Sequence, residues 1–288
     1  MDDRVLVLGA VAYDPKVVTI WEGFRVWFAG RGLGFDYVLY SNYERQVEAL
    51  VDGHVDVAWN SPLAWARSHR LAGARGREVR AVAMRDTDCD LTSVVAVRAD
   101  SGIESVADLK GRTVAVGAVD SPQATLIPLA HLGAAGLEPG RDFTVRYHDV
   151  AVGKHGDHVG GEREAARALM AGEADAACMI DGNHLVFSTE GTLPAGATRI
   201  VAVTPPYDHC NFTVLMGGGA PPALVDRFVG LLLEMSYDDP EVRPLLDLEG
   251  LKAWRPGRTP GYAQLEAAVD GFGFYDREGR VIAAGYLP

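Results

Sequence analysis

The sequence predicts an α/β protein built from two lobes. Runs typical of strands alternate with runs typical of helices from residue 5 to residue 72, and the alternation starts again near Ser93. Such alternation is typical of parallel sheets whose strands are joined by right-handed helical crossovers. A chain of 288 residues is also long enough to form two separate cores.

The first series of elements opens with a buried strand, because VLVLGAVAY (5–13) is apolar almost throughout. Apolar residues at helical spacing predict a helix over 17–30, and its aromatic side chains should lie in the core. We expect the remaining elements of this series to be a strand at 35–41, a helix at 43–53, a strand at 55–60 and a helix at 62–72.

The second series repeats this arrangement further along the chain. We expect strands at 93–99, 113–119, 143–150 and 174–180, and helices at 106–111, from near Gln123, and at 161–171. Proline clusters at 204–206 and 220–222 mark connections, and the last helices are expected near 221–236 and 260–270.

One internal similarity supports two related lobes. VEALVDGHVDVAWNSP (47–62) aligns with ARALMAGEADAACMIDG (166–182), and each segment predicts a helix, a glycine turn and a strand of small residues. The alternative is that any helix–turn–strand unit has this pattern. If the lobes are related, ligands should lie beyond the carboxyl ends of the strands, near Asn60–Ser61 in one lobe and Asp181–His184 in the other.

Composition limits the partners. A net charge of −12 argues against nucleic acids and anionic membranes. The three cysteines form no CxxC pair, and the apolar run after Met-Asp-Asp-Arg lacks the basic start of a signal peptide. We therefore expect a cytoplasmic protein with reduced thiols and no membrane span.

The stretch VGKHGDHVGGERE (152–164) is the most unusual polar segment. Lys154 and His155 precede a helix expected to start near Gly160, and free N–H groups at a helix start favour an anion. Ser121 and Thr125, at another expected helix start, could add neutral hydrogen bonds to that anion. The alternative is a solvated loop without a ligand.

Metal binding and acid–base catalysis remain open for the same region. The possible metal ligands match no standard spacing, but their types suit zinc or iron: His155, His158, Cys178, His184, Asp208, His209 and Cys210. Cys178 falls inside a strand, where a cysteine is usually a core residue. If the protein is an enzyme, the candidate catalytic residues are His155, His158, Asp181, His184 and His209.

Three separated stretches carry a resemblance to a known family. YERQVEALVDGHVDVAWNSPLAW, VVAVRADSGIESVADLKGRTVAVG and KHGDH…ALMAGEADAA resemble the phosphate/phosphonate substrate-binding proteins of ABC transporters. The resemblance implies a two-lobe type II periplasmic-binding-protein fold with the ligand in a cleft between the lobes. It also implies that both ends of the chain form the first lobe. Since the pattern restarts near Ser93, we expect residues 1–90 and 205–288 to form lobe 1, and residues 91–204 to form lobe 2.

The resemblance also places candidate ligand-binding residues. The family's aromatic before a helix corresponds to Tyr43, its Pro-x-x-aromatic turn to Pro62 and Trp65, and its anion-binding histidine to His155. Its hydroxyl cluster and its carboxylate correspond to Ser121, Thr125 and Asp181. The complete candidate set is Tyr43, Asn60, Ser61, Trp65, Ser121, Gln123, Thr125, Lys154, His155 and Asp181.

Two departures from the family pattern bear on the site. The family usually has a run of Ser, Thr and Gly where this chain reads DSPQAT (120–125), and a carboxylate beside an anion is unfavourable. Residues 61–63 read SPL where the family commonly has GPL.

The leading hypothesis is a protein that binds a small, polar, anionic ligand of the phosphonate or phosphate type, without a cofactor. An ABC transporter is a partner only if a leader has been removed. The alternative is a cytosolic enzyme on the same fold that uses the His/Asp/Cys set, with or without zinc or iron. Tyr40 and Trp59 could add planar contacts to the ligand.

Overall fold

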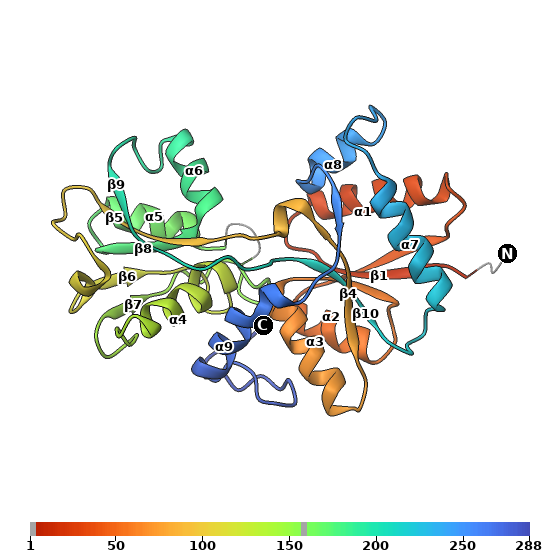
Figure 1. Ribbon diagram of the computed structural model, residues 1–288, viewed down its shortest axis with the longest axis horizontal. Helices are drawn as coiled ribbons and strands as arrows, with labels where there is room; N and C mark the ends of the chain where they lie inside the picture. Colours follow the sequence, from red (N-terminus) through yellow and green to blue (C-terminus); the bar gives the residue numbers. More distant parts are fainter. Residues whose placement is uncertain (1–3, 157–159) are drawn as a thin grey trace. The chain divides into compact units, whose positions relative to one another are not determined.

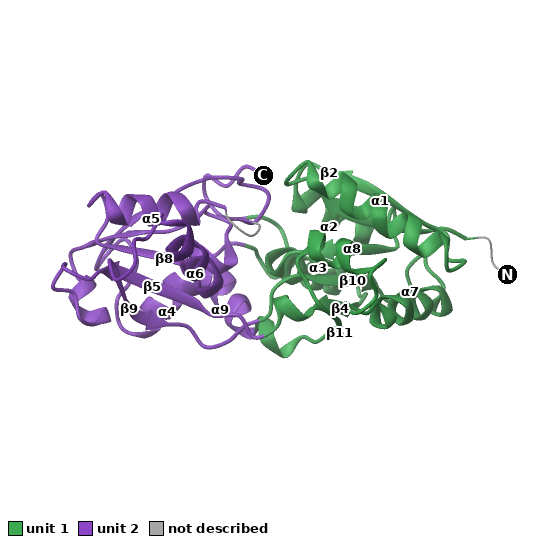
Figure 2. Ribbon diagram, turned by 90° about the horizontal axis from the view of Figure 1, so that it is seen from above, with its two compact units in different colours: residues 1–89, 208–262, 275–281 green, residues 90–207, 263–274, 282–288 purple. Residues whose placement is uncertain are grey.

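The computed structural model describes residues 4–156 and 160–288, which fall into two compact units (Figure 2). Unit 1 contains the chain up to Cys89 together with Asp208–Tyr262 and Tyr275–Val281. Unit 2 contains Asp90–Tyr207, Ala263–Phe274 and Ile282–Pro288.

Within the described chain, unit 1 is built on a six-stranded mixed sheet of order β11-β4-β10-β3-β1-β2. The strands are β1 (Leu6–Val11), β2 (Phe35–Tyr40), β3 (Val57–Asn60), β4 (Val79–Arg85), β10 (Asn211–Leu215) and β11 (Trp254–Pro256). The predicted β-α-β-α-β series is confirmed, since β1 pairs in parallel with both β2 and β3. The sheet is mixed because β10 inserts antiparallel between β3 and β4.

Helices cover both faces of this sheet (Figure 1). One face carries α1 (Lys16–Ala29), α7 (Pro222–Glu234) and α8 (Arg243–Glu249), and the other carries α2 (Tyr43–Val51) and α3 (Pro62–Ala74). The aromatic side chains expected in the core are there: Trp21 lies 5.5 Å from Phe24 and 6.0 Å from Phe212 between ring centroids. Short 3-10 turns occur at η1 (Asp86–Asp88) and η4 (Pro260–Tyr262).

The described part of unit 2 is built on a five-stranded mixed sheet of order β7-β6-β8-β5-β9. Its strands are β5 (Ser93–Arg98), β6 (Thr113–Ala115), β7 (Thr144–Arg146), β8 (Ala176–Ile180) and β9 (Thr198–Val203). The other elements are η2 (Val106–Leu109), the π-helical turn η3 (Pro122–Leu126), α4 (Ile127–Ala134), α5 (Glu162–Met170), α6 (Asp181–Glu190) and α9 (Ala263–Phe272).

Strand β5 shows how the unit 2 sheet separates two cores. Its alternate residues Val94 and Ala96 pack in one cluster with side chains of α5 and α6, including Phe187. Val95 and Val97 point to the opposite face and pack with Leu129 and other residues near α4. The period of two along the strand therefore produces two buried layers.

The internal similarity corresponds to a repeated structural unit. In unit 1, the Asp56 N–H donates to the Val7 carbonyl (2.8 Å) and the Asp56 carboxylate accepts from the Val7 N–H (2.9 Å). In unit 2, Asp175 makes the same two bonds to Thr113, at 2.8 and 2.9 Å. Each aspartate thus fixes the start of a strand against its parallel neighbour, so the two units share this pair of hydrogen bonds at the same place in their sheets.

The end of the chain is divided between the units. The resemblance assigned all of residues 205–288 to lobe 1, but α9 packs on α4 and η3 and groups with unit 2. The tail Ile282–Pro288 does so as well, whereas Tyr275–Val281 groups with unit 1. The chain therefore passes between the units after Cys89, Tyr207, Tyr262, Phe274 and Val281.

Candidate ligand-binding site

The candidate site in unit 2 lies where β6 and β8 end. These strands pair in parallel, so their carboxyl ends meet at one edge of the sheet. The chain after β6 leads into η3, and the chain after β8 leads directly into α6. Polar side chains are fully buried at this edge, within a unit whose cores are otherwise apolar.

The segment Ala118–Leu126 forms a tight turn held by its own hydroxyl groups. The Ser121 hydroxyl caps η3 by accepting from the Ala124 N–H (3.2 Å). The Thr125 hydroxyl donates to the Ala118 carbonyl at 2.8 Å. The Leu126 N–H reaches the Ser121 carbonyl, which makes η3 a π turn, a feature that is frequent at functional sites.

Gln123 connects this turn to the polar loop singled out from the sequence. Its side-chain amide donates to the Gly156 carbonyl at 2.7 Å and to the Glu162 carboxylate at 3.3 Å. Its backbone carbonyl accepts from the Ser93 hydroxyl, which also lies 2.7 Å from the Tyr207 hydroxyl. Burial raises the pKa of Tyr207, so this phenol stays protonated as a donor.

Two glycines allow the loop to pack closely on the turn. Gly156 has φ +59°, and a Cβ there would lie 2.6 Å from the Ser121 hydroxyl oxygen. Gly161 has φ +81°, and a Cβ there would overlap the carbonyl oxygen of His148. Gly156 and Gly161 are therefore required by close packing as well as by the left-handed backbone.

The N–H groups of this loop bind a carboxylate of the chain itself. Asp120 is fully buried, and one of its oxygens accepts from the N–H groups of Gly153 (2.7 Å) and His155 (3.1 Å). The same oxygen accepts from the Tyr286 hydroxyl at 3.3 Å. Asp120, noted above as a departure from the family pattern, therefore organises the loop.

A second buried carboxylate, Glu162, was not predicted. It is the first residue of α5, and besides Gln123 it accepts from the Ile180 N–H (3.0 Å) and the Asn183 amide (2.8 Å). It therefore joins the ends of β8, α6 and η3. Its position directly after the glycine pair was a signal in the sequence. That signal did not predict burial, because a glutamate at a helix start is usually explained by its favourable interaction with the helix dipole.

The histidines of the candidate set differ in their surroundings. His155 is buried and has φ +53°, an uncommon backbone conformation for a non-glycine residue. Lys154 beside it is half-buried. His158 lies outside the described residues. His184 lies 3.1 Å from the Thr198 hydroxyl, and burial lowers its pKa.

Asp181 is exposed, whereas Ser121, Gln123, Thr125 and His155 are buried. It begins α6, and its carboxylate accepts from the Thr92 hydroxyl (2.9 Å) and the Gly182 N–H (2.7 Å). Its neighbour Asn183 reaches Glu162. The turn, the loop and the start of α6 are thus joined by hydrogen bonds within unit 2.

The candidates in unit 1 belong to its own buried framework. The Asn60 amide accepts from Gln46 (2.8 Å) and donates to Ser68 (3.1 Å) and Thr213 (2.9 Å). Ser61 caps α3 by accepting from the Ala64 N–H. Tyr43 and Trp65 are buried in apolar clusters, and Trp65 also packs on the Tyr262 ring at 5.6 Å. Their contact with a ligand stays a prediction.

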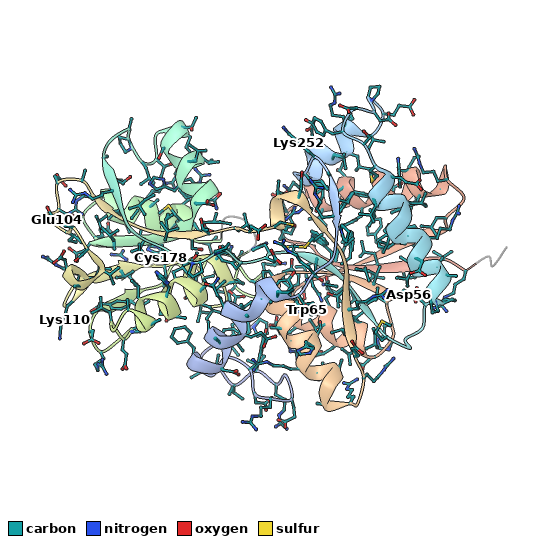
Figure 3. The ribbon with its side chains drawn as sticks, viewed as in Figure 1. Asp56, Trp65, Glu104, Lys110, Cys178 and Lys252 are labelled. Carbon is teal, nitrogen blue, oxygen red and sulfur yellow. The ribbon has the colours of Figure 1, made fainter. Side chains whose placement is uncertain are left out.

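The residues considered for a metal are distributed over both units. Cys178 lies in the middle of β8 (Figure 3) and is fully buried in an apolar cluster, so it is a core residue. Burial raises the pKa of its thiol to about 12. Asp208 forms an ion pair with Arg258 at 2.5 Å in unit 1. His209 and Cys210 are also in unit 1, next to Asp88, which the sequence did not indicate.

Comparison with known proteins places this architecture in a family. A model of the family described as ABC transporter, phosphonate, periplasmic substrate-binding protein matches residues 13–261. The chain belongs to this family. The resemblance stated from three sequence motifs is therefore confirmed. No curated protein matches the chain.

Members of the phosphonate-binding family and similar proteins share the fold at low identity. PhnD1 from Prochlorococcus marinus, solved with methylphosphonate, has a TM-score of 0.70 at 16% identity and covers 93% of this chain and 98% of its own. A Xanthomonas citri protein solved with ATP has a TM-score of 0.69 at 20% identity, with 93% and 97% covered. A phosphonate-transporter binding component from Pseudomonas aeruginosa has a TM-score of 0.61 at 14% identity, with 93% and 86% covered.

These similarities confirm the predicted fold class for this phosphonate-binding family member. It is an α/β fold with two mixed sheets that form two lobes, of the type II periplasmic-binding-protein kind. Across the described residues, no helix is both long and apolar enough to cross a membrane.

Proposed function

We propose that this chain binds a small, polar, anionic ligand of the phosphonate or phosphate type and presents it to an ABC transporter. Family membership supports the class of function. The observation that carries the proposal is the set of fully buried hydroxyl and amide side chains at the ends of β6 and β8, namely Ser93, Ser121, Gln123 and Thr125.

The proposed ligand contacts follow from the chemistry of these groups. The Ser121 hydroxyl, which accepts a bond within the turn, and the His155 imidazole can donate to phosphonate oxygens, whereas the Ser93 and Thr125 hydroxyls already donate to backbone carbonyls. Hydrogen bonds to charged groups contribute about 1.5–3 kcal/mol each. Three or four such bonds, after the cost of association, correspond to a Kd of about 1 µM. Lys154 beside His155 would add positive charge near the ligand.

The buried carboxylates restrict where the anion can lie. Asp120 already accepts from the loop N–H groups, and Glu162 lies against Gln123. We therefore expect a phosphonate to approach the Ser121 hydroxyl and the His155 side chain, away from the loop amides. The location of this ligand in a cleft between the lobes is part of the proposal.

Calorimetric titration of the full chain with methylphosphonate, inorganic phosphate and sulfate tests the proposal. We expect at least one of the three to bind with a micromolar Kd and His155→Ala to weaken that binding about ten- to a hundredfold. The matched control is His131→Ala, which removes a histidine of the same unit on α4, and it should leave the Kd within about twofold. Absence of binding to all three anions, or equal effects of the two variants, would contradict the proposal.

A further inference from the structure

A cluster of three different donor groups lies in unit 1 and contains none of the residues proposed above as ligand contacts. The carboxylate of Asp88, the imidazole of His209 and the thiol of Cys210 each offer one atom, and these atoms lie within 4.8 Å of one another. The His209 Nδ1 atom is 3.1 Å from the Cys210 Sγ atom and 3.4 Å from an Asp88 oxygen. All three side chains are buried.

The backbone brings these residues together from distant parts of the sequence. Asp88 ends η1, directly after β4, and His209 and Cys210 immediately precede β10. Because β4 and β10 are antiparallel neighbours, the two segments meet at the same edge of the sheet. The His209 N–H donates to the Asp88 carbonyl at 2.8 Å, which fixes the two segments against each other.

The surrounding groups hold the carboxylate in place. Arg85 binds Asp88 through two hydrogen bonds, of 2.5 Å and 3.0 Å, and lies 3.3 Å from the carboxylate of Glu249. Its guanidinium also lies over the Trp59 ring at 5.2 Å. Carboxylates that bind metals are commonly oriented by such outer hydrogen bonds, so the arginine does not exclude a ligand role for Asp88.

Anionic groups gather around this cluster. The carboxylates of Asp88 and Glu249 both lie against the Arg85 guanidinium. A divalent cation bound to the Asp88 carboxylate and to a Cys210 thiolate would meet ligands of opposite charge, which favours its binding there.

We propose that Asp88, His209 and Cys210 bind one zinc ion. One oxygen, one nitrogen and one sulfur ligand suit this borderline cation, and a fourth tetrahedral position would be left for water or another group. Binding would release the thiol proton of Cys210. The ion would join the end of β4–η1 to the start of β10, beside two of the points where the chain passes between the units.

Zinc titration of the full chain, purified without chelator and followed by native mass spectrometry, tests this site. We expect one zinc per wild-type chain, and less than about one tenth of that occupancy for Cys210→Ala under the same conditions. The matched control is Cys178→Ala, which also removes a fully buried thiol. Within the described parts of the chain Cys178 belongs to no such cluster, so this variant should keep the zinc. Loss of zinc from neither variant, or from both equally, would overturn the proposal.

X-ray absorption at the zinc edge gives a measurement on the wild-type chain alone, in case Cys210→Ala does not fold. We expect one sulfur neighbour at about 2.3 Å and the other neighbours, nitrogen or oxygen, at about 2.0–2.2 Å. A wild-type chain that binds no stoichiometric zinc would overturn the site. Neither outcome bears on anion binding in unit 2, so the two proposals fail separately.

Discussion

At the scale of single residues, Asp120 shows how a buried carboxylate of the chain itself can occupy an anion-binding loop. A loop with successive N–H groups directed inward can hold an anion, and the sequence hypothesis assigned an external anion to this region. The structure shows that Asp120 binds the N–H groups of Gly153 and His155. The carboxylate therefore replaces a ligand at that position and fixes the backbone of His155.

We expect Asp120→Asn to loosen this loop, because an amide in the same place loses the negative charge that attracts two N–H groups. The free energy of unfolding should fall by about 1–3 kcal/mol. Hydrogen exchange of the amides at 153 and 155 should become faster. Tyr286→Phe is the control, since it removes the hydroxyl donor to Asp120 and leaves both backbone bonds. Unchanged exchange in Asp120→Asn would show that the loop does not depend on this carboxylate.

At the scale of elements, the close approach of the loop to its neighbours depends on Gly161. We expect Gly161→Ala to destabilise unit 2 more than Gly136→Ala does. Both glycines have a positive φ, but a Cβ at Gly136 meets nothing within 4 Å, whereas one at Gly161 overlaps the His148 carbonyl. The difference should be about 1–3 kcal/mol, the usual cost of overpacking, and denaturant unfolding measures it. Equal losses would mean that the left-handed backbone accounts for the whole effect.

Elements with strong periodicity could be predicted from the sequence, and irregular ones could not. The strand and helix pairs that flank Gly53 and Gly172 were predicted because an apolar pattern, a glycine and a second apolar pattern follow one another. Strand β4 was missed because arginines at both ends obscure the apolar run. Strand β9 was missed because it lies at the edge of its sheet and several of its apolar residues are exposed.

The candidate site was predictable to a smaller extent than the fold. The positions of Ser121 and Thr125 at a helix start follow from local sequence and from the family resemblance. The roles of Asp120 and Glu162 depend on which distant N–H groups they meet, such as those of His155 and Ile180, and no local pattern contains that information. The meeting of Asp88 with Cys210 likewise depends on the antiparallel insertion of β10.

At the scale of the whole molecule, the C-terminal segment is divided between the two units, so each unit should depend on a different part of it for stability. The sequence resemblance placed residues 205–288 in one lobe, but α7 belongs to unit 1 and α9 to unit 2. Leu232 on α7 and Leu265 on α9 are both fully buried, so they form a matched pair of variants.

We expect Leu265→Ala to destabilise unit 2 and Leu232→Ala to destabilise unit 1. Each substitution should cost about 2–5 kcal/mol, because a buried leucine leaves a cavity when it is shortened. Hydrogen exchange separates the two effects along the sequence. For Leu265→Ala, protection should fall in η3 and α4, because α9 packs on these elements. For Leu232→Ala, protection should fall in strands β1 and β3, because Leu232 lies in the cluster that contains Leu8 and Trp59. Faster exchange in β1 and β3 for Leu265→Ala would instead return the last helix to the first lobe, as the sequence resemblance implied.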